Sequence, residues 1–185
     1  PAGISDRLMT LFSRKGKRIR STLLCLLANC GKQKPNIDRV AHACAAVELL
    51  HLASLVHDDI IDGTDVRRGQ KTAHREWGTQ VAVLIGDYVL SQSMRCVIDE
   101  DSNIPGIISD AADKLIVGDI LELDHCGDMY FSRQAYNEII DGKTAALIDA
   151  AARLGGIMAG FHQPMVDECA KMGTHFGIAF QIIDD

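Results

Sequence analysis

The stretch from Glu48 to Asp62 constrains the fold most, because its long apolar run ends in three carboxylates. A helix has 3.6 residues per turn, so Asp58 and Asp62 lie one turn apart on one face, and His51 lies two turns before Asp58. Like charges at this spacing repel each other, and buried carboxylates are costly unless a cation compensates them. A hard divalent cation such as Mg²⁺, which prefers oxygen ligands, would remove this conflict.

Basic residues on either side of this stretch supply positive charge for an anion. Arg67 and Arg68 follow Asp62 closely, and Lys17 and Arg20 lie three positions apart where an early helix begins. Guanidinium groups and helix N-termini both bind phosphate well. Each segment alone is also typical of a solvated turn or a helix cap. Together, however, the carboxylates and the basic residues indicate a metal-bridged diphosphate site.

Composition favours a single helical domain. The 185 residues are 47% hydrophobic and 5% aromatic, with four prolines and no segment that resembles a linker. The sequence lacks an alternating strand pattern, so we expect an all-α bundle without strands that occupies residues 1–185 as one domain. The net charge of −6 argues against nucleic acid as a partner.

We expect a polar loop at 63–74 and helices at about residues 21–29, 37–61, 79–98, 107–123, 132–141, 145–159 and 164–185. Glycine costs about 1 kcal/mol relative to alanine inside a helix, so Gly86 suggests that another helix approaches closely there. The Gly-Lys-Thr sequence at 142–144 interrupts the helical pattern. It lacks the upstream glycine and the preceding strand of a nucleotide-binding P-loop. A further break is expected near residues 155–156.

Cysteine usage predicts a reducing compartment. The six cysteines show neither a CxxC pair nor zinc-site spacing, and several occupy apolar positions of expected helices, so we interpret them as small buried hydrophobic residues. The sequence shows no signal peptide and no run of 18 apolar residues. These observations lead us to expect a cytoplasmic protein.

Five segments resemble a known family, the trans-isoprenyl diphosphate synthases, and within it the long-chain polyprenyl diphosphate synthases such as the heptaprenyl and octaprenyl enzymes. The segments are GKRIR at 16–20, HLASLVHDDIIDGTDVRRGQKTAH at 51–74, GDYVL at 86–90, GKTAAL at 142–147 and FQIIDD at 180–185. The resemblance implies a helical bundle around a central apolar cavity. Two aspartate-rich motifs would face each other across it and hold Mg²⁺ ions that bind an allylic diphosphate.

The chain departs from the family pattern at several positions. Lys15 and Ser21 replace a glycine and a proline of the first motif, and Asp119 and Glu122 stand where the family commonly has Glu and Gln. The second motif normally continues as DDxxD, and family members have further helices beyond it. We therefore expect Asp185 to be followed by helices that close the bundle.

The resemblance implies a role for each matched position. Isopentenyl diphosphate would be bound by Lys17, Arg20, His51 and Arg68. The allylic diphosphate would be contacted by Arg67, Lys143, Thr144 and Gln181. Mg²⁺ would be bound by Asp58 and Asp62, with Asp59 in support and Asp184 and Asp185 near a third metal. Asp58, Asp59, Asp62, Arg67 and Lys143 would thus carry catalysis.

The implied reaction condenses isopentenyl diphosphate with an allylic diphosphate to give an all-trans polyprenyl diphosphate. Ala53 and Ser54, the fifth and fourth residues before Asp58, would line the top of the tunnel for the growing tail. Both are small, so we expect a product longer than farnesyl diphosphate. Alternatively, they are small only because another helix packs closely against them.

Other hypotheses remain open at this stage. A class I terpene cyclase uses a similar first motif but has no second diphosphate to bind, which disfavours it. A non-catalytic subunit of a heteromeric synthase is a second possibility. A di-iron bundle, which needs two Glu-x-x-His pairs, is a third, and Glu48 with His51 forms one such pair. We further expect a homodimer, with contacts from residues 41–46 and 79–98, and peripheral membrane association through the lipid product.

Overall fold

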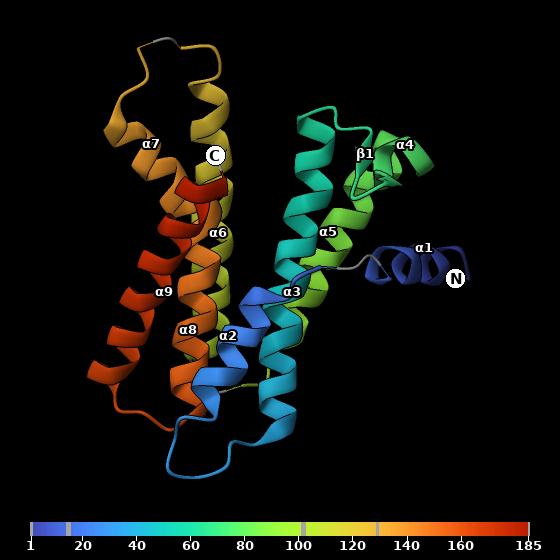
Figure 1. The fold of residues 1–185 in the computed structure, drawn as a ribbon. Helices are drawn as coiled ribbons and strands as arrows, with labels where there is room; N and C mark the ends of the chain where they lie inside the picture. The colour runs from blue at the N-terminus through green and yellow to red at the C-terminus, as the bar shows by residue number, and fades with distance from the viewer. Residues whose placement is uncertain (1, 14–15, 101–102, 129, 185) are drawn as a thin grey trace.

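The computed structural model describes residues 2–13, 16–100, 103–128 and 130–184. Helices form most of it; the longer ones run roughly parallel or antiparallel to one another, whereas the N-terminal helix lies across them (Figure 1). The helices are α1 (Ala2–Phe12), α2 (Ile19–Ala28), α3 (Ile37–Ile61), α4 (Ala73–Trp77), α5 (Thr79–Arg95), α6 (Asn103–Asp124), α7 (Arg133–Ile140), a π-helical turn (Asp141–Ala145), α8 (Ala146–Met158) and α9 (Gln163–Asp184).

The helices form two groups that α2 connects. On one side α3 packs along α5, with α1 and α4 at the outer edge; on the other, α8 packs against α9 and α6 (Figure 1). The short helix α2 contacts both α3 and α8. The hydrophobic core follows this division, since one buried cluster joins α2, α3, α6 and α8, and a second joins α3 to α4 and α5.

The long helix α3 has the bounds that the sequence predicts. Asn36 caps it by accepting hydrogen bonds from the backbone N–H groups of Asp38 and Arg39. Gly63, with φ of +62°, follows its C-terminal cap. By length and composition α3 could cross a membrane, contrary to the expectation from sequence, but here it is the central helix and contributes to both core clusters.

The expectation of a strand-free polar loop at 63–74 is wrong. Two short antiparallel strands, β1 (Val66–Arg67) and β2 (Gln70–Lys71), form a hairpin, and α4 follows directly. Arg68 and Gly69 occupy the turn with φ of 53° and 78°, as a two-residue hairpin loop requires. Strands of two residues are too short to give an alternating sequence pattern.

Glycines mark the closest helix contacts. α8 continues unbroken through residues 155–156. A Cβ atom on Gly155 would lie 2.7 Å from Cβ of Leu27, so α8 packs tightly on α2 at this glycine. The expected break there is therefore wrong. A Cβ atom on Gly118 would lie 2.6 Å from the backbone nitrogen of Lys143, which brings α6 against the π turn.

All six cysteines are free thiols. Cys169 is buried, and Cys25, Cys44 and Cys96 are partly buried, as expected for small hydrophobic residues in helices. Cys30 and Cys126 are exposed, so that interpretation does not hold for them.

Candidate active site

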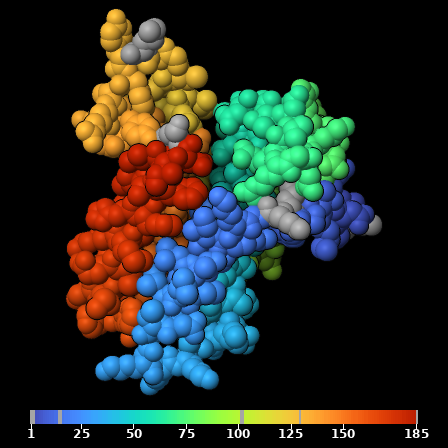
Figure 2. Space-filling model, viewed as in Figure 1, coloured from blue at the N-terminus to red at the C-terminus, as the bar shows by residue number. Residues whose placement is uncertain are grey.

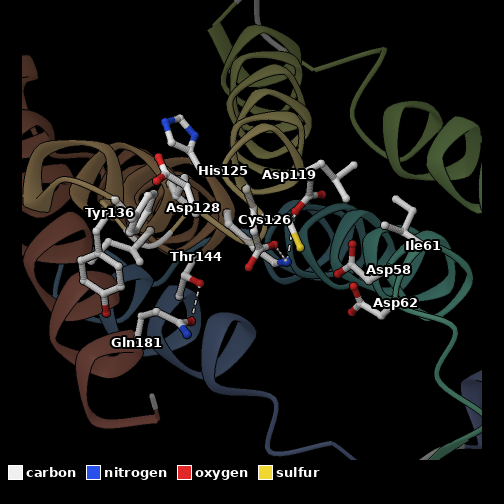
Figure 3. A pocket seen from close by; sticks show the side chains of 16 residues that line it. Asp58, Ile61, Asp62, Asp119, His125, Cys126, Asp128, Tyr136, Thr144 and Gln181 are labelled. Atoms are coloured by element: carbon white, nitrogen blue, oxygen red, sulfur yellow. Dashed lines mark hydrogen bonds and ion pairs between the residues drawn. The ribbon is translucent and has the colours of Figure 1, made fainter.

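A cavity of about 540 Å³ opens between the C-terminal end of α3 and the group formed by α6, α7 and α9. Figure 2 shows the notch between these two sides of the molecule. Asp58 and Asp62 line one wall, and Asp119 projects from α6 toward the same space (Figure 3). The two α3 carboxylates are thus brought together on one face, as their i, i+4 spacing predicts.

Burial and mutual repulsion disturb the ionisation of these carboxylates. Burial, together with the charges of Asp119 and Asp62, raises the pKa of Asp58 to about 7 despite the opposing effect of Lys143 and Arg67. Burial likewise raises the pKa of Asp119. One oxygen of Asp119, Oδ1, is buried and accepts no hydrogen bond from the described residues, although it lies 3.5 Å from Nζ of Lys143.

Lys143 faces the carboxylates from the π-helical turn. Its ammonium group forms a short ion pair with Glu122 and lies near Asp119. Burial alone would lower the pKa of Lys143, but the hydrogen bond to Glu122 and the charges of Asp58, Glu122 and Asp119 raise it. The Gly-Lys-Thr sequence at 142–144 lies within this π turn, and Lys143 lines the cavity from it.

Thr144 and Gln181 meet on the wall opposite Asp58. The Thr144 hydroxyl donates a hydrogen bond of 2.7 Å to Oε1 of Gln181, linking the π turn to α9 (Figure 3). Both residues line the cavity beside Lys143. The structure therefore joins three positions of the predicted allylic-diphosphate group, although they are separated by up to 38 residues.

The fourth predicted position, Arg67, has a structural partner as well. Its Nε donates a hydrogen bond of 2.6 Å to Oδ1 of Asp59, whose side chain is only 2% exposed. This partly buried ion pair ties the β-hairpin to the end of α3. Asp59 thus supports the hairpin and is not among the residues that line the cavity.

A second basic group surrounds the start of α2. Arg20 is partly buried, its buried Nε has no hydrogen-bond partner among the described residues, and burial lowers its pKa. Burial and the nearby charges of Arg20, Arg68, Arg67 and Arg18 lower the pKa of His51 to about 3. A partly buried guanidinium with an unused donor, beside a neutral imidazole, is suited to receive an anion.

The remaining predicted residues lie further from these groups. Lys17 is exposed, and a Cβ on its neighbour Gly16 would lie 3.1 Å from Nη1 of Arg68, so the 16–20 segment adjoins the hairpin. Asp184 is exposed on the last turn of α9 and is not among the cavity-lining residues. Lys15 and Asp185 lie outside the described residues.

Ala53 and Ser54 do not line the described cavity. Ala53 is 2% exposed and packs in the cluster that includes Ala82, Ile85 and Val89 of α5. Ser54 is partly buried and donates a hydrogen bond to the carbonyl of His51. Their assignment to product length remains a prediction.

Sequence reasoning missed the apolar half of the cavity. Leu123, Phe131, Tyr136, Ile139 and Ile140 line it together with Ile61. Phe131 packs edge-on against both His125 and Tyr136, with ring centroids 5.2 and 6.4 Å apart. The segment appears in the sequence as an ordinary amphipathic helix, and only its docking beside α6 makes it part of the site.

The donor set suits a hard divalent cation that shares its ligands with a phosphate. The candidate ligands on α3 and α6 are carboxylate oxygens, and one oxygen of Asp119 is buried without a hydrogen bond from the described part of the chain. Over the described ranges, no group of three or more His, Cys, Asp or Glu residues is arranged to enclose an ion by itself. A cation that completes its shell with substrate oxygens and water fits this arrangement. The fold and site together define a helical bundle with a carboxylate-lined cavity.

Comparisons with known proteins agree with this description. The family model "Polyprenyl synthetase" matches residues 2–185. The nonaprenyl diphosphate synthase of Mycobacterium tuberculosis is 38% identical over 182 residues, which are 98% of this chain and 54% of that protein. A crystal structure of a geranylgeranyl pyrophosphate synthase superposes with a TM-score of 0.93 at 30% identity, covering 100% of this chain and 57% of that one.

A second similar structure contains ligands. The polyprenyl synthase of Caulobacter crescentus, complexed with calcium and isoprenyl diphosphate, has a TM-score of 0.86 at 30% identity and covers 100% of this chain and 55% of that one. The present chain belongs to the polyprenyl synthetase family, the trans-isoprenyl diphosphate synthases. It spans about half the length of the curated relatives that it matches.

Proposed function

We propose that the protein is a Mg²⁺-dependent trans-prenyltransferase that condenses isopentenyl diphosphate with an allylic diphosphate to make a long-chain polyprenyl diphosphate. The observation that carries this proposal is the convergence of Asp58, Asp62 and Lys143 on one cavity. Such an arrangement of anionic metal ligands and a cation is suited to a departing diphosphate. Relatives named nonaprenyl, octaprenyl and heptaprenyl diphosphate synthase support the long-chain product.

The chemical problem is ionisation of the allylic diphosphate, which leaves a carbocation and a highly charged leaving group. Mg²⁺ held by Asp58 and Asp62 would supply electrostatic stabilisation to that leaving group. Lys143 is aimed at the same space and would exchange its contact with Glu122 for the diphosphate. The Thr144 hydroxyl, fixed by Gln181, would orient the same group.

The other residues would bind the second substrate and protect the cation. Arg20 and His51 would bind isopentenyl diphosphate, together with Lys17 and with Arg68 of the adjoining hairpin. The double bond of isopentenyl diphosphate would then attack the allylic carbon, and a proton would be lost to the departing diphosphate. Leu123, Phe131 and Ile140 form an apolar wall that would exclude water from the cation.

Two features weigh against the alternatives. A terpene cyclase has one diphosphate substrate, whereas this chain has a second basic group around Arg20 that is separate from the cavity lining. A non-catalytic subunit has no need for a carboxyl with the raised pKa of Asp58 opposite a lysine in an open cavity. We also propose a cytoplasmic homodimer that contacts membranes through its lipid product.

The decisive experiment measures incorporation of radiolabelled isopentenyl diphosphate by the full-length protein. We expect chain elongation that requires Mg²⁺ and falls by orders of magnitude in Asp58→Ala. The matched control is Asp113→Ala, which removes an exposed α6 carboxylate outside the cavity lining. Cyclised products without isopentenyl consumption would instead support a terpene cyclase, and wild-type rates in Asp58→Ala would refute the proposed metal site.

A further inference from the structure

Glu48 of α3 binds the start of α2 with both of its carboxylate oxygens. Oε1 accepts hydrogen bonds from the hydroxyl and the backbone N–H of Ser21, at 2.8 and 3.2 Å. Oε2 accepts a hydrogen bond of 3.2 Å from Nη1 of Arg18. The Glu48 side chain is only 16% exposed, so these contacts occupy a largely buried carboxylate.

This contact replaces the cap that α2 lacks. Arg18, at the N-cap position, has the left-handed φ and ψ of 51° and 35° and provides no side-chain cap. The first N–H groups of a helix need an acceptor, and a carboxylate there also interacts favourably with the helix dipole. A left-handed conformation costs a non-glycine residue free energy, so the surrounding contacts must maintain it.

The residues that Glu48 holds lie next to the proposed isopentenyl diphosphate site. Arg20 directly precedes Ser21 and keeps its buried Nε free of hydrogen bonds among the described residues. His51 lies one turn after Glu48 on α3, beside the same arginines. Glu48 is therefore linked to both groups that would receive the diphosphate, to Arg20 through Ser21 and to His51 along α3, although the reaction itself does not require it.

We propose that Glu48 is a positioning residue: by capping α2 through Ser21 and anchoring Arg18, it fixes the Arg20 guanidinium where it binds the diphosphate of the second substrate. This inference rests on the function proposed above. It assigns a role to the Glu48 carboxylate, which belongs neither to the proposed metal ligands nor to the lining of the cavity that contains Lys143.

The Glu48 carboxylate has two opposite effects on diphosphate binding: it positions Arg20, and its charge repels the anion. A carboxylate near an anion site also repels the anion, so removing its charge favours binding. The variant Glu48→Gln removes the charge but retains an acceptor for Ser21, whereas Glu48→Ala removes both. If positioning dominates, Glu48→Ala weakens binding by about tenfold, the equivalent of one charged hydrogen bond, and Glu48→Gln by less than about threefold.

The test is the Michaelis constant for each substrate in Glu48→Ala, Glu48→Gln and Ser21→Ala. We expect a larger rise of the KM for isopentenyl diphosphate in Glu48→Ala than in Glu48→Gln. The KM for the allylic diphosphate should stay within about twofold of the wild-type value in both variants. Ser21→Ala, which keeps the charge, should also raise the KM for isopentenyl diphosphate. The matched control is Glu100→Ala, because Glu100 is 15% exposed and receives a 2.7 Å hydrogen bond from Arg39 at the far end of α3.

Calorimetric titration with inorganic diphosphate tests the inference without turnover. Weaker binding by Glu48→Ala than by Glu48→Gln supports it even if the protein proves inactive in elongation, which would refute only the proposed function. The inference is overturned if Glu48→Ala binds inorganic diphosphate as tightly as Glu48→Gln does, or more tightly. Equal increases in both Michaelis constants would also overturn it, because these would indicate a general loss of structure.

Discussion

Gly86 of α5 lies directly against the imidazole of His57 on α3: a Cβ atom added to this glycine would be 2.2 Å from Nε2 of His57. The ring also lies 3.3 Å from the carbonyl oxygen of Val83 and 3.5 Å from Oδ1 of Asp87. His57 immediately precedes Asp58, so this contact connects the packing of α3 on α5 to the orientation of the cavity carboxylates.

We expect Gly86→Ala to lower stability and metal-dependent activity together. The new methyl group would displace the His57 ring, at a cost of about 1–3 kcal/mol for overpacking, which exceeds the gain of about 1 kcal/mol from helix propensity. Gly106→Ala is the matched control, because that helical glycine has no atom within 4 Å of the added Cβ. Thermal unfolding and elongation assays of both variants measure the difference. Equal melting temperatures would contradict the proposed contact.

Asp58 should reduce stability at alkaline pH while it enables metal binding. Its folded-state pKa of about 7 exceeds the ordinary value of 3.8, so the folded protein binds more protons between these values and loses stability as pH rises through them. Asp58→Asn should therefore melt at a higher temperature than wild type at pH 8 without metal, and at a similar temperature at pH 4. If the difference in melting temperature between Asp58→Asn and wild type is the same at pH 4 and pH 8, this prediction is refuted.

Proton competition should also weaken Mg²⁺ binding by the wild-type protein below pH 7. The metal binds the ionised carboxylate, so one linked proton lowers the affinity by up to about tenfold per pH unit below the pKa. Titration of Mg²⁺ with inorganic diphosphate present, at several pH values, measures this slope. An affinity that is independent of pH between 5 and 7 would argue against Asp58 as a ligand.

His51 should destabilise the protein in acid. Its pKa is about 3 in the folded state and near 6.5 when unfolded, so the unfolded chain binds more protons between these values and stability falls as pH drops through them. One proton limits the slope to about 1.4 kcal/mol per pH unit. Denaturant unfolding of wild type and His51→Gln from pH 7 to pH 4 isolates the contribution. The variant should lack this part of the pH dependence.

Ala53→Phe should shorten the product if Ala53 borders the path of the prenyl tail. Its close packing against α5 also predicts a loss of about 1–3 kcal/mol from overpacking. Ser54→Phe, at the partly buried neighbouring position, provides a second variant with different packing. Product chromatograms would decide the question, and unchanged chain lengths in both variants would place the floor of the tunnel elsewhere.

We expect the full-length protein to be a homodimer. Exposed apolar side chains on α5 and α6, including Leu84, Tyr88, Ile116 and Ile120, give these helices an uncovered surface. Light scattering measures the mass directly. Leu84→Glu should weaken association, with Met9→Glu on α1 as an equally exposed control. A monomeric wild-type protein would refute the prediction.

Several local features were predictable from sequence because their causes are local. The i, i+4 spacing of Asp58 and Asp62 sets their shared face, Asn36 caps α3 as an Asx residue does, and Gly63 supplies the positive φ after its end. The Gly-Lys-Thr sequence at 142–144 indicated the irregularity that the structure forms as a π turn. Such features depend on backbone geometry and on residues within one or two turns.

Other features were decided only by tertiary structure, since they depend on residues distant in the chain. The ion pair of Lys143 with Glu122 depends on the close approach of α6 to the π turn at Gly118, and the anchoring of α2 depends on Glu48 from another helix. The raised pKa of Asp58 likewise requires burial and the charge of Asp119 across the cavity. Sequence therefore determined which groups each helix carries, whereas packing determined which groups meet, because electrostatic and hydrogen-bond energies depend on distance and burial.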